Sequence, residues 1–421
     1  MRIGLYTWSS EGDVRPFVAL AAGLAARGHD VRLGYSAIDG RDWSAVCAPL
    51  GFRARAVGAD EIAKARASDG PHNTALLGKG NPGKQIYDVV VGLLDPVVEA
   101  MWADAEEGAA DLDVAVVHLL AHPAMTAALA RAIPVATVQP APVTPTRELA
   151  PLGAPESAWL RPLSWWLADR VSRLWLVPRI NAFRARAGVA PRKAMFPADD
   201  VALSMTCVSP TLVSRPSDWP PHEIITGFFE LAGHAHAWER PEALDRFLAD
   251  GEAPWLMGFG SMLSMPGEET NQCVRTMLEA VDRAGARALV QAPWSELPAM
   301  PESPRVFRLG RAPHAEILPH CRGMVHHGGA GTTQAACLAG RPSVVVPFLG
   351  DQPFWAGRLR ALGIAPAPVP RRSLDARRLA EAMQALDADA GARSKAEAIG
   401  AKMRAEDGVR VAAEQLERLV R

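Results

Sequence analysis

A glycine-rich stretch in the C-terminal half carries residue types suited to holding an anion. It reads VHHGGAGTTQAACLAG from Val325 to Gly340, with two histidines before the glycines and two threonines after them. The pattern predicts a short strand, a glycine-rich turn and a helix that begins near Thr332 or Thr333. The first N–H groups of a helix lack intrahelical partners and carry positive dipole character, so they favour phosphate. A buried structural turn explains the glycines alone about equally well.

The residues around this turn restrict the class of ligand that it can bind. The turn is not a Walker loop, since no lysine follows its last glycine, and it lacks the dinucleotide G-x-G-x-x-G spacing. An imidazole of His326 or His327 can donate a hydrogen bond to a phosphate oxygen. The apolar run that follows ends at Asp351 and Gln352, whose carboxylate and amide can bind vicinal sugar hydroxyls. Phosphate and hydroxyl contacts one helix apart indicate a nucleotide-sugar.

The N-terminal region offers groups for proton transfer. The segment EGDVRP places Glu11, Asp13 and Arg15 directly after an apolar run. A carboxylate between the C-terminal end of a strand and the start of a helix is well placed to accept a proton. The residues alone leave two interpretations of Asp13 about equal, a general base or a cap of the following helix.

Two other patterns resemble metal sites without completing one. His118 and His122 stand four residues apart across an expected strand end, and no third ligand is recognisable. We interpret them as polar lining or as contacts of an acceptor. The Asp-x-Asp triplets at 111–113 and 387–389 lie away from the phosphate loop, and we interpret both as solvated surface. No metal and no cofactor is expected.

Composition limits the class of protein. The chain has 421 residues and a net charge of −1, with 49% apolar and 22% charged residues, which favours two well-packed domains. No basic run suggests a nucleic-acid partner. Five scattered cysteines without C-x-x-C spacing fit a reduced cytoplasmic protein. The N-terminus reaches an acid too early for a signal peptide, and no segment approaches the roughly 20 apolar residues of a membrane span. Oligomeric state is left open.

Apolar runs alternate with helical patterns along the chain. Runs typical of parallel strands occur at residues 2–8, 31–36, 113–120, 134–140, 254–261, 287–293, 305–310, 323–327 and 343–348. A helix is predicted over 16–30, because Pro16 suits a first turn, and a single amphipathic helix over 394–420. Two successive βαβα series predict an α/β fold with two doubly wound sheets.

The expected domains follow from this alternation. The first covers residues 1–225, a linker covers 226–240, and the second covers 241–421. Two places for the last helix stay open: it packs back on the first domain and braces the hinge, or it caps the second domain alone.

The segment from Trp159 to Gly188 breaks the alternation. It carries four of the twelve tryptophans, with arginines between them, and its apolar residues recur at helical spacing. We interpret it first as a helix that packs its tryptophan face on the N-terminal domain. Two alternatives stay open: the aromatic residues, Trp165 and Trp166 among them, line an apolar acceptor cleft, or they make a peripheral contact with a membrane surface.

The chain resembles the UDP-glycosyltransferase superfamily, which comprises inverting, metal-independent transferases with the GT-B fold. The stretch RAPHAEILPHCRGMVHHGGAGTTQAACLAGRPSVVVPFLGDQPFWAGRLRALG is similar to the donor-binding signature of that superfamily. GFGSM at 258–262 and EGDVRPFVALAAGLAARGH resemble the branch of sterol glucosyltransferases and bacterial antibiotic glycosyltransferases. The resemblance covers most of the chain and implies two Rossmann-like domains that face each other across a cleft.

The resemblance implies roles for individual donor-site residues. The diphosphate contacts are assigned to Ser261, His327, Gly329, Ala330, Gly331 and Thr332. Arg311 and His314 occupy the stretch that packs on the nucleobase, and Asp351 and Gln352 hold sugar hydroxyls. Plant members carry a tryptophan at the position of Arg311, for which a stacked guanidinium is the substitute, and a ribose-binding glutamate at the position of Ala335.

The implied reaction is transfer of a hexose, glucose being the first expectation, from a UDP- or dTDP-sugar to a hydroxyl of a small apolar acceptor. Sterols, polyketides, phenolics and lipids are all candidate acceptors. Asp13 stands where related enzymes place their general base, and the acceptor side is assigned to Glu11, His118, His122, Trp165 and Trp166. Two alternatives are a sugar-nucleotide epimerase or hydrolase of the same architecture, and a non-catalytic nucleotide-sugar-binding protein.

Overall fold

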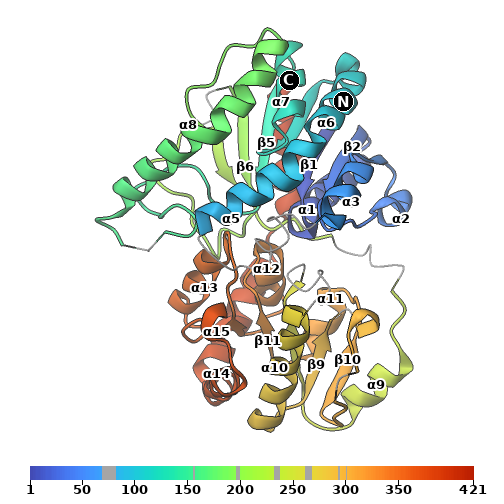
Figure 1. Ribbon diagram of the computed structural model, residues 1–421, viewed down its shortest axis with the longest axis vertical. Coiled ribbons are helices and arrows are strands. Elements are labelled where there is room, and N and C mark those ends of the chain that lie inside the picture. The colour runs from blue at the N-terminus through green and yellow to red at the C-terminus, as the bar shows by residue number, and fades with distance from the viewer. Residues whose placement is uncertain are drawn as a thin grey trace. The chain divides into compact units, whose positions relative to one another are not determined.

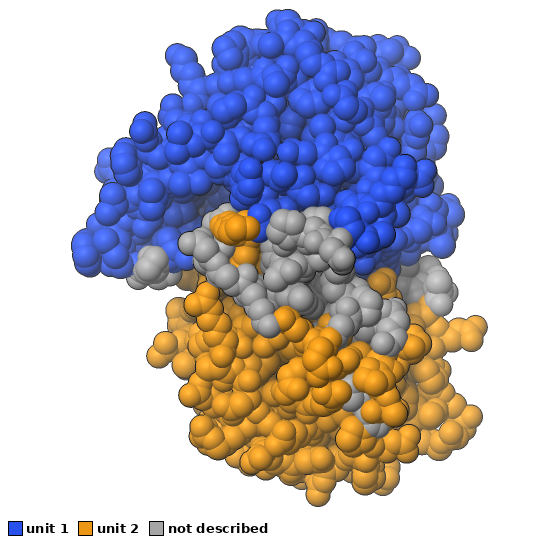
Figure 2. All heavy atoms as spheres, viewed as in Figure 1, with its two compact units in different colours: residues 1–72, 87–234, 406–421 blue, residues 73–86, 235–405 orange. Residues whose placement is uncertain are grey.

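The structure, a computed structural model, describes residues 1–68, 82–154, 157–195, 200–231, 238–260, 268–292, 294–299 and 301–421. The chain divides into two compact units, which Figure 2 shows in different colours. Unit 1 comprises residues 1–72, 87–234 and 406–421, and unit 2 comprises residues 73–86 and 235–405. Each unit contains one parallel sheet with helices packed on it (Figure 1), so the α/β fold predicted from the sequence is confirmed.

The sheet of unit 1 has seven parallel strands in the order β3-β2-β1-β4-β5-β6-β7. Their bounds are β1 Arg2–Ser9, β2 Asp30–Ala37, β3 Arg53–Ala56, β4 Val114–His118, β5 Val135–Gln139, β6 Leu203–Thr206 and β7 Glu223–Ile225. All residues of β4 and β5 are buried, which explains their continuous apolar runs. The strand order reverses between β1 and β4, and ligands of doubly wound sheets bind at such a switch point.

The helices of unit 1 lie in the connections between these strands, except α16, which follows the last strand of the chain. They are α1 Glu11–Ala26, α2 Ser44–Cys47, α3 Ala59–Ala67, α6 Val98–Gly108, α7 His122–Ala130, α8 Arg161–Arg186 and α16 Gly408–Leu419. α5 spans Pro82–Val89, and the division between the units falls within it. α1 and α16 share one core cluster, to which Phe17 and Leu20 contribute from α1 and Leu416 from α16.

α1 begins five residues before the predicted start. Ser10 is its N-cap residue, and the N–H groups of Asp13 and Val14 bond to the Ser10 carbonyl at 3.0 and 3.2 Å. Proline usually ends or begins a helix, because it lacks an N–H and clashes with the carbonyl four residues earlier; the pattern therefore indicated a start at Pro16. Since Ser10 holds the cap position, Asp13 lies inside the first turn and its interpretation as the helix cap is wrong.

The single helix predicted over 394–420 is two helices, α15 (Ala390–Met403) and α16. Asp407 caps α16 by accepting the N–H of Arg410 at 2.9 Å. The next residue, Gly408, packs so tightly on Gly227 that a Cβ there would lie 2.5 Å from the Gly227 carbonyl oxygen. The cap and this backbone contact end one helix and begin the next, although the helical spacing of the apolar residues continues across the break.

The sheet of unit 2 has five parallel strands in the order β10-β9-β8-β11-β12. Their bounds are β8 Trp255–Gly258, β9 Ala288–Gln291, β10 Val306–Leu309, β11 Gly323–His326 and β12 Ser343–Val345. The helices of this unit are α9 Glu242–Ala249, α10 Glu268–Ala284, α11 His314–Ile317, α12 Ala330–Leu338, α13 Gln352–Ala361, α14 Ala376–Ala388 and α15. Here the strand order reverses between β8 and β11, at the start of the glycine-rich turn.

All five cysteines are free and buried. Among the helices that the structure describes, none combines the length and apolar character needed to cross a bilayer.

Candidate functional site

The glycine-rich turn lies at the switch point of the sheet of unit 2. β11 ends at His326 and α12 begins at Ala330, two or three residues before the predicted start. The N-cap residue of α12 is Gly329, which has no side chain to cap the helix. Because no side chain of Gly329 covers the helix start, the N–H groups of Gly331 and Thr332 in its first turn can be presented to an anion.

His327 packs against this turn and is only 8% exposed. A Cβ on Gly329 would lie 2.5 Å from its Nε2, and a Cβ on Gly260 would lie 3.0 Å from its Cε1. The ring therefore fits between two residues that have no side chains. Burial, with the nearby His314 as the second cause, lowers the pKa of His327 to about 4. The imidazole is neutral at pH 7 and can donate one N–H to a phosphate oxygen.

The neighbouring His326 has a structural environment. It is completely buried, and its Nδ1 accepts the N–H of Gly328 at 3.0 Å. Burial, and then the charges of His327 and His314, hold its pKa well below the ordinary value of 6.5. Of the two adjacent histidines, His327 is the one whose ring lies against Gly329.

Asp351 and Gln352 connect the next loop to the start of α12. Asp351 Oδ2 accepts the N–H of Ala330 at 3.2 Å and the indole N–H of Trp355 at 2.8 Å. Gln352 Oε1 accepts the backbone N–H groups of Phe348 and Leu349, at 2.7 and 3.1 Å. The two side chains thus shape the loop beside the glycine-rich turn in addition to any contact with a sugar.

The loop of Arg311 is held by a residue that sequence reasoning missed. Gln291, the last residue of β9, donates from Nε2 to the carbonyl oxygens of Gly310 and Ala312, at 3.1 and 3.3 Å. Arg311 lies exposed between these two carbonyls, and His314 is the first residue of α11. The position of Gln291 at the carboxyl end of a predicted strand, where ligands of such sheets bind, could have indicated a role near the site. Ser261 lies outside the described residues.

Asp13 and His118 lie together at the switch point of the sheet of unit 1. His118 is the last residue of β4, and its Nε2 is 3.6 Å from Asp13 Oδ1. The N–H of Leu120 donates to His118 Nδ1 at 3.3 Å, and Nε2 is the ring nitrogen that faces Asp13. The Thr7 hydroxyl donates to the backbone carbonyl of Asp13 at 3.2 Å. The Asp13 side chain is 21% exposed and open to solvent.

Glu11 is engaged in ion pairs at the same end of α1. Its Oε1 lies 2.7 Å from the guanidinium groups of both Arg15 and Arg41. Burial acts to raise the pKa of Glu11, but the two guanidinium groups outweigh it and lower the pKa to about 2. A carboxylate held ionised between two arginines is a poor proton acceptor.

His122 lies in the core of unit 1. Its ring packs edge-on against Phe183, with centroids 5.3 Å apart. Burial, with Arg192 as the second cause, lowers its pKa to about 3. The side chain is almost completely buried and offers no surface to an acceptor in this conformation.

The tryptophans of α8 have different environments. Trp165 is half-buried and donates its indole N–H to the Leu149 carbonyl at 2.9 Å. Trp166 is 58% exposed, and Trp159, just before the helix, is 80% exposed. The interpretation that the helix packs its tryptophan face on the domain is therefore wrong for Trp159 and Trp166.

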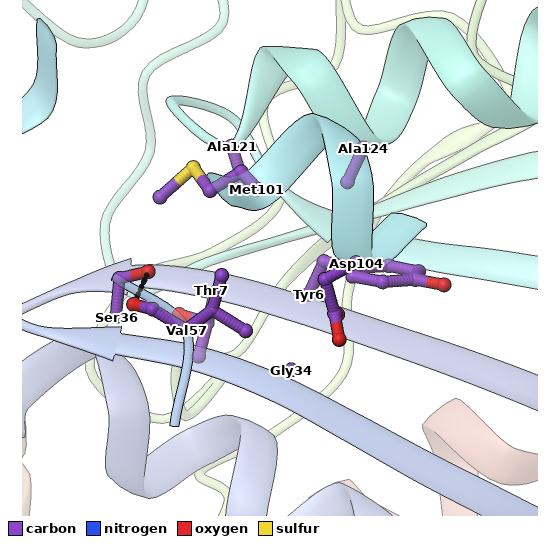
Figure 3. A pocket seen from close by; sticks show the side chains of 9 residues that line it. All are labelled: Tyr6, Thr7, Gly34, Ser36, Val57, Met101, Asp104, Ala121 and Ala124. Carbon is purple, nitrogen blue, oxygen red and sulfur yellow. Dashed lines mark hydrogen bonds between the residues drawn. The ribbon is translucent and has the colours of Figure 1, made fainter. Parts of the chain in front are cut away.

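A small cavity lies inside unit 1, beside β1 and β2. Figure 3 shows the residues that line it: Tyr6, Thr7, Gly34, Ser36, Val57, Met101, Asp104, Ala121 and Ala124. Its volume of about 10 Å³ is room for a water molecule and not for an acceptor. Among the described residues the Tyr6 hydroxyl has no hydrogen-bond partner there, and burial raises its pKa to about 12.

In the part of the chain that the structure describes, no group of three or more His, Cys, Asp or Glu side chains could hold a metal ion. Asp387, from one of the two Asp-x-Asp triplets, accepts from Arg322 and from the Trp255 indole, both at 3.3 Å. The interpretation of that triplet as solvated surface is wrong for Asp387, which is a partly buried ion-pair partner.

Several known proteins are similar to this chain. Residues 275–419 match the family model of the erythromycin biosynthesis protein CIII-like C-terminal domain. The chain is 30% identical over 423 residues to a sterol 3-beta-glucosyltransferase of Arabidopsis thaliana, covering 97% of this chain and 64% of that protein. It is 32% identical over 434 residues to the O-mycaminosyltylonolide 6-deoxyallosyltransferase of Streptomyces fradiae, covering 97% and 95%. It thus spans less than two thirds of the plant relative and nearly all of the bacterial one.

Two solved structures share the fold over the full chain. The glycotransferase of kitacinnamycin has a TM-score of 0.71 at 22% identity, covering 100% of this chain and 99% of that one. The glycosyltransferase VinC, solved in complex with DTDP, has a TM-score of 0.69 at 20% identity, with the same two coverages.

Proposed function

Because the chain belongs to the glycosyltransferase family that contains these plant and Streptomyces enzymes, we propose that it transfers a sugar from a nucleotide donor to a hydroxyl of a small apolar acceptor. The acceptor class is a sterol or a polyketide-type aglycone, by analogy with the two relatives. The sugar is a hexose, with glucose the first candidate and a deoxyhexose the second. UDP and dTDP are the two candidate nucleotides.

We assign the donor diphosphate to the start of α12. The observation that carries this assignment is a helix start whose N-cap residue is a glycine, with the neutral ring of His327 set between Gly260 and Gly329. As the bond from the anomeric carbon to the diphosphate breaks, negative charge grows on the leaving group. The N–H groups of Gly331 and Thr332 and the N–H of His327 stabilise that charge by fixed dipoles.

We assign proton abstraction to Asp13. The acceptor oxygen attacks the anomeric carbon with inversion, and its proton passes to the Asp13 carboxylate as the new bond forms. His118 orients the carboxylate through its Nε2–H and cannot take the proton itself, because the N–H of Leu120 faces its other nitrogen. Glu11 stays paired with Arg15 and Arg41.

A turnover assay with the full chain tests this function. The protein is incubated with UDP-glucose or dTDP-glucose, with and without EDTA, and with a panel of sterols, macrolide aglycones and phenols. The proposal predicts nucleotide release that depends on the acceptor, persists in EDTA and is matched by a glycosylated product. Turnover without an acceptor would instead favour a hydrolase or epimerase, and saturable nucleotide-sugar binding without any turnover would favour a binding protein.

A further inference from the structure

The exposed apolar side chains of unit 1 gather on one half of one helix. Of the seven large hydrophobic side chains that are exposed among the described residues, six lie between residues 159 and 174. These six are Trp159, Leu163, Trp166, Leu167, Val171 and Leu174. Single exposed hydrophobic residues are normal on a protein surface, whereas such a concentration marks an interaction site.

The five of these side chains that lie on α8 form a continuous stripe, because Leu163 is followed at helical spacing by Trp166 and Leu167, and then by Val171 and Leu174. Trp159 lies just before the helix. The second half of α8 packs on unit 1 through Leu176, Val177, Ile180 and Phe183. In contrast, no residue from Arg161 to Trp175 is buried. Figure 1 shows α8 as a long helix at the edge of unit 1. Its second half thus anchors an exposed first half.

Basic side chains accompany the stripe. Residues 161–174 contain three arginines and a single acid, Asp169, in a chain whose net charge is −1. Arg173 pairs with Asp169 at 2.6 Å. The guanidinium of Arg170 lies 5.9 Å from the ring centroid of Trp166, within the stripe, and no ion pair to Arg170 is found among the described residues.

We propose that residues 159–174 dock peripherally on the surface of an anionic lipid bilayer. Tryptophan and leucine side chains enter the boundary between headgroups and acyl chains, and Arg170 stays at the level of the lipid phosphates. A second copy of the chain is a poorer occupant, because a two-fold contact between two stripes places both Arg170 side chains in one desolvated patch whose nearest acid, Asp169, is already paired with Arg173.

Vesicle co-sedimentation of the full chain tests the proposal. The probes are vesicles of phosphatidylcholine alone and of phosphatidylcholine with phosphatidylglycerol. The triple variant Leu163→Ser, Leu167→Ser, Leu174→Ser removes three exposed side chains, so the fold is retained, which far-UV circular dichroism checks. We expect the wild type to bind the anionic vesicles with a partition coefficient at least about tenfold above that of the triple variant.

A matched pair of charge variants tests the electrostatic part. Arg170→Glu changes the net charge within the stripe, and Arg418→Glu makes the same change at an exposed position of α16. We expect Arg170→Glu alone to weaken binding to anionic vesicles, with the loss reduced at high salt. Failure of the wild type to sediment with the anionic vesicles would overturn the proposal, as would equal binding by the triple variant. A wild-type dimer that the triple variant converts to a monomer, without vesicle binding, would assign the stripe to self-association instead.

Discussion

His118 Nε2 faces the Asp13 carboxylate at 3.6 Å while its Nδ1 accepts the N–H of Leu120. The second contact occupies Nδ1 and leaves Nε2 as the ring nitrogen that can donate towards Asp13. This geometry supports our proposal that the carboxylate accepts the acceptor proton and that the histidine orients it. His118 ends β4 and Asp13 lies in the first turn of α1, just after β1, at the point where the order of the sheet reverses.

Asp13→Asn is expected to lower the transfer rate by at least about 100-fold, because an amide cannot accept the acceptor proton. The affinity for UDP or dTDP is expected to stay within about twofold of the wild type, because the donor contacts are assigned to unit 2 and Asp13 belongs to unit 1. Initial rates and calorimetric titration with UDP or dTDP measure the two quantities. Asp111→Asn, an equivalent change at an exposed surface pair with Arg2, serves as the control. Normal turnover by Asp13→Asn would show that another group is the base.

His118→Leu is expected to lower kcat by about tenfold or more with a smaller change in the KM of the acceptor, because the carboxylate loses its orienting donor. His118→Gln retains an N–H donor and is expected to recover much of the rate. Steady-state kinetics of both variants give the comparison. If the two variants lose activity equally and in parallel with their thermal midpoints, the role of His118 is structural only.

Gly329→Ala is expected to weaken binding of UDP or dTDP by at least about tenfold, since its methyl group would lie 2.5 Å from His327 Nε2 and push the ring away. Gly357→Ala places a methyl group in open space on α13 and is the matched control. Calorimetric titration measures both dissociation constants. Wild-type affinity in Gly329→Ala would remove His327 from the diphosphate site.

His122→Gln is expected to flatten the dependence of stability on pH. The folded pKa of His122 is about 3, below its ordinary value of 6.5, so between these values the unfolded chain binds a proton that the folded chain does not. Stability therefore falls as pH decreases below 6.5, by about 1.4 kcal/mol per pH unit for this group. Urea unfolding of the wild type and the variant at pH 5 and 6.5 gives the comparison, with about 2 kcal/mol less loss expected for the variant. If the stability of both proteins changed equally with pH, the low pKa of folded His122 would be contradicted.

The sequence predicted most of the strands, because buried parallel strands are continuous apolar runs between turn residues. It missed the short strands β3, β6 and β7. The start of α1 was missed, since Pro16 indicates a first turn and the turn before it, from Glu11, has no apolar periodicity. The break before α16 was missed for a different reason. It depends on the contact between Gly227 and Gly408, which are far apart along the chain.

Site geometry could be predicted only where it is local. The turn that carries His327 and Gly329 is contained in one short motif, and its strand, turn and helix follow from the residues. The approach of His118 to Asp13 depends on β1 lying beside β4, which no local pattern indicates. The exposure of Trp166 could not be predicted either, because helical spacing is the same for a buried face and an exposed one.

The most direct test of the central claim is a crystal structure of the full chain with UDP or dTDP. We expect the diphosphate to lie over the start of α12, with oxygens accepting from the N–H groups of Gly331 and Thr332 and from the His327 ring. A nucleotide bound elsewhere, with the start of α12 unliganded, would contradict it.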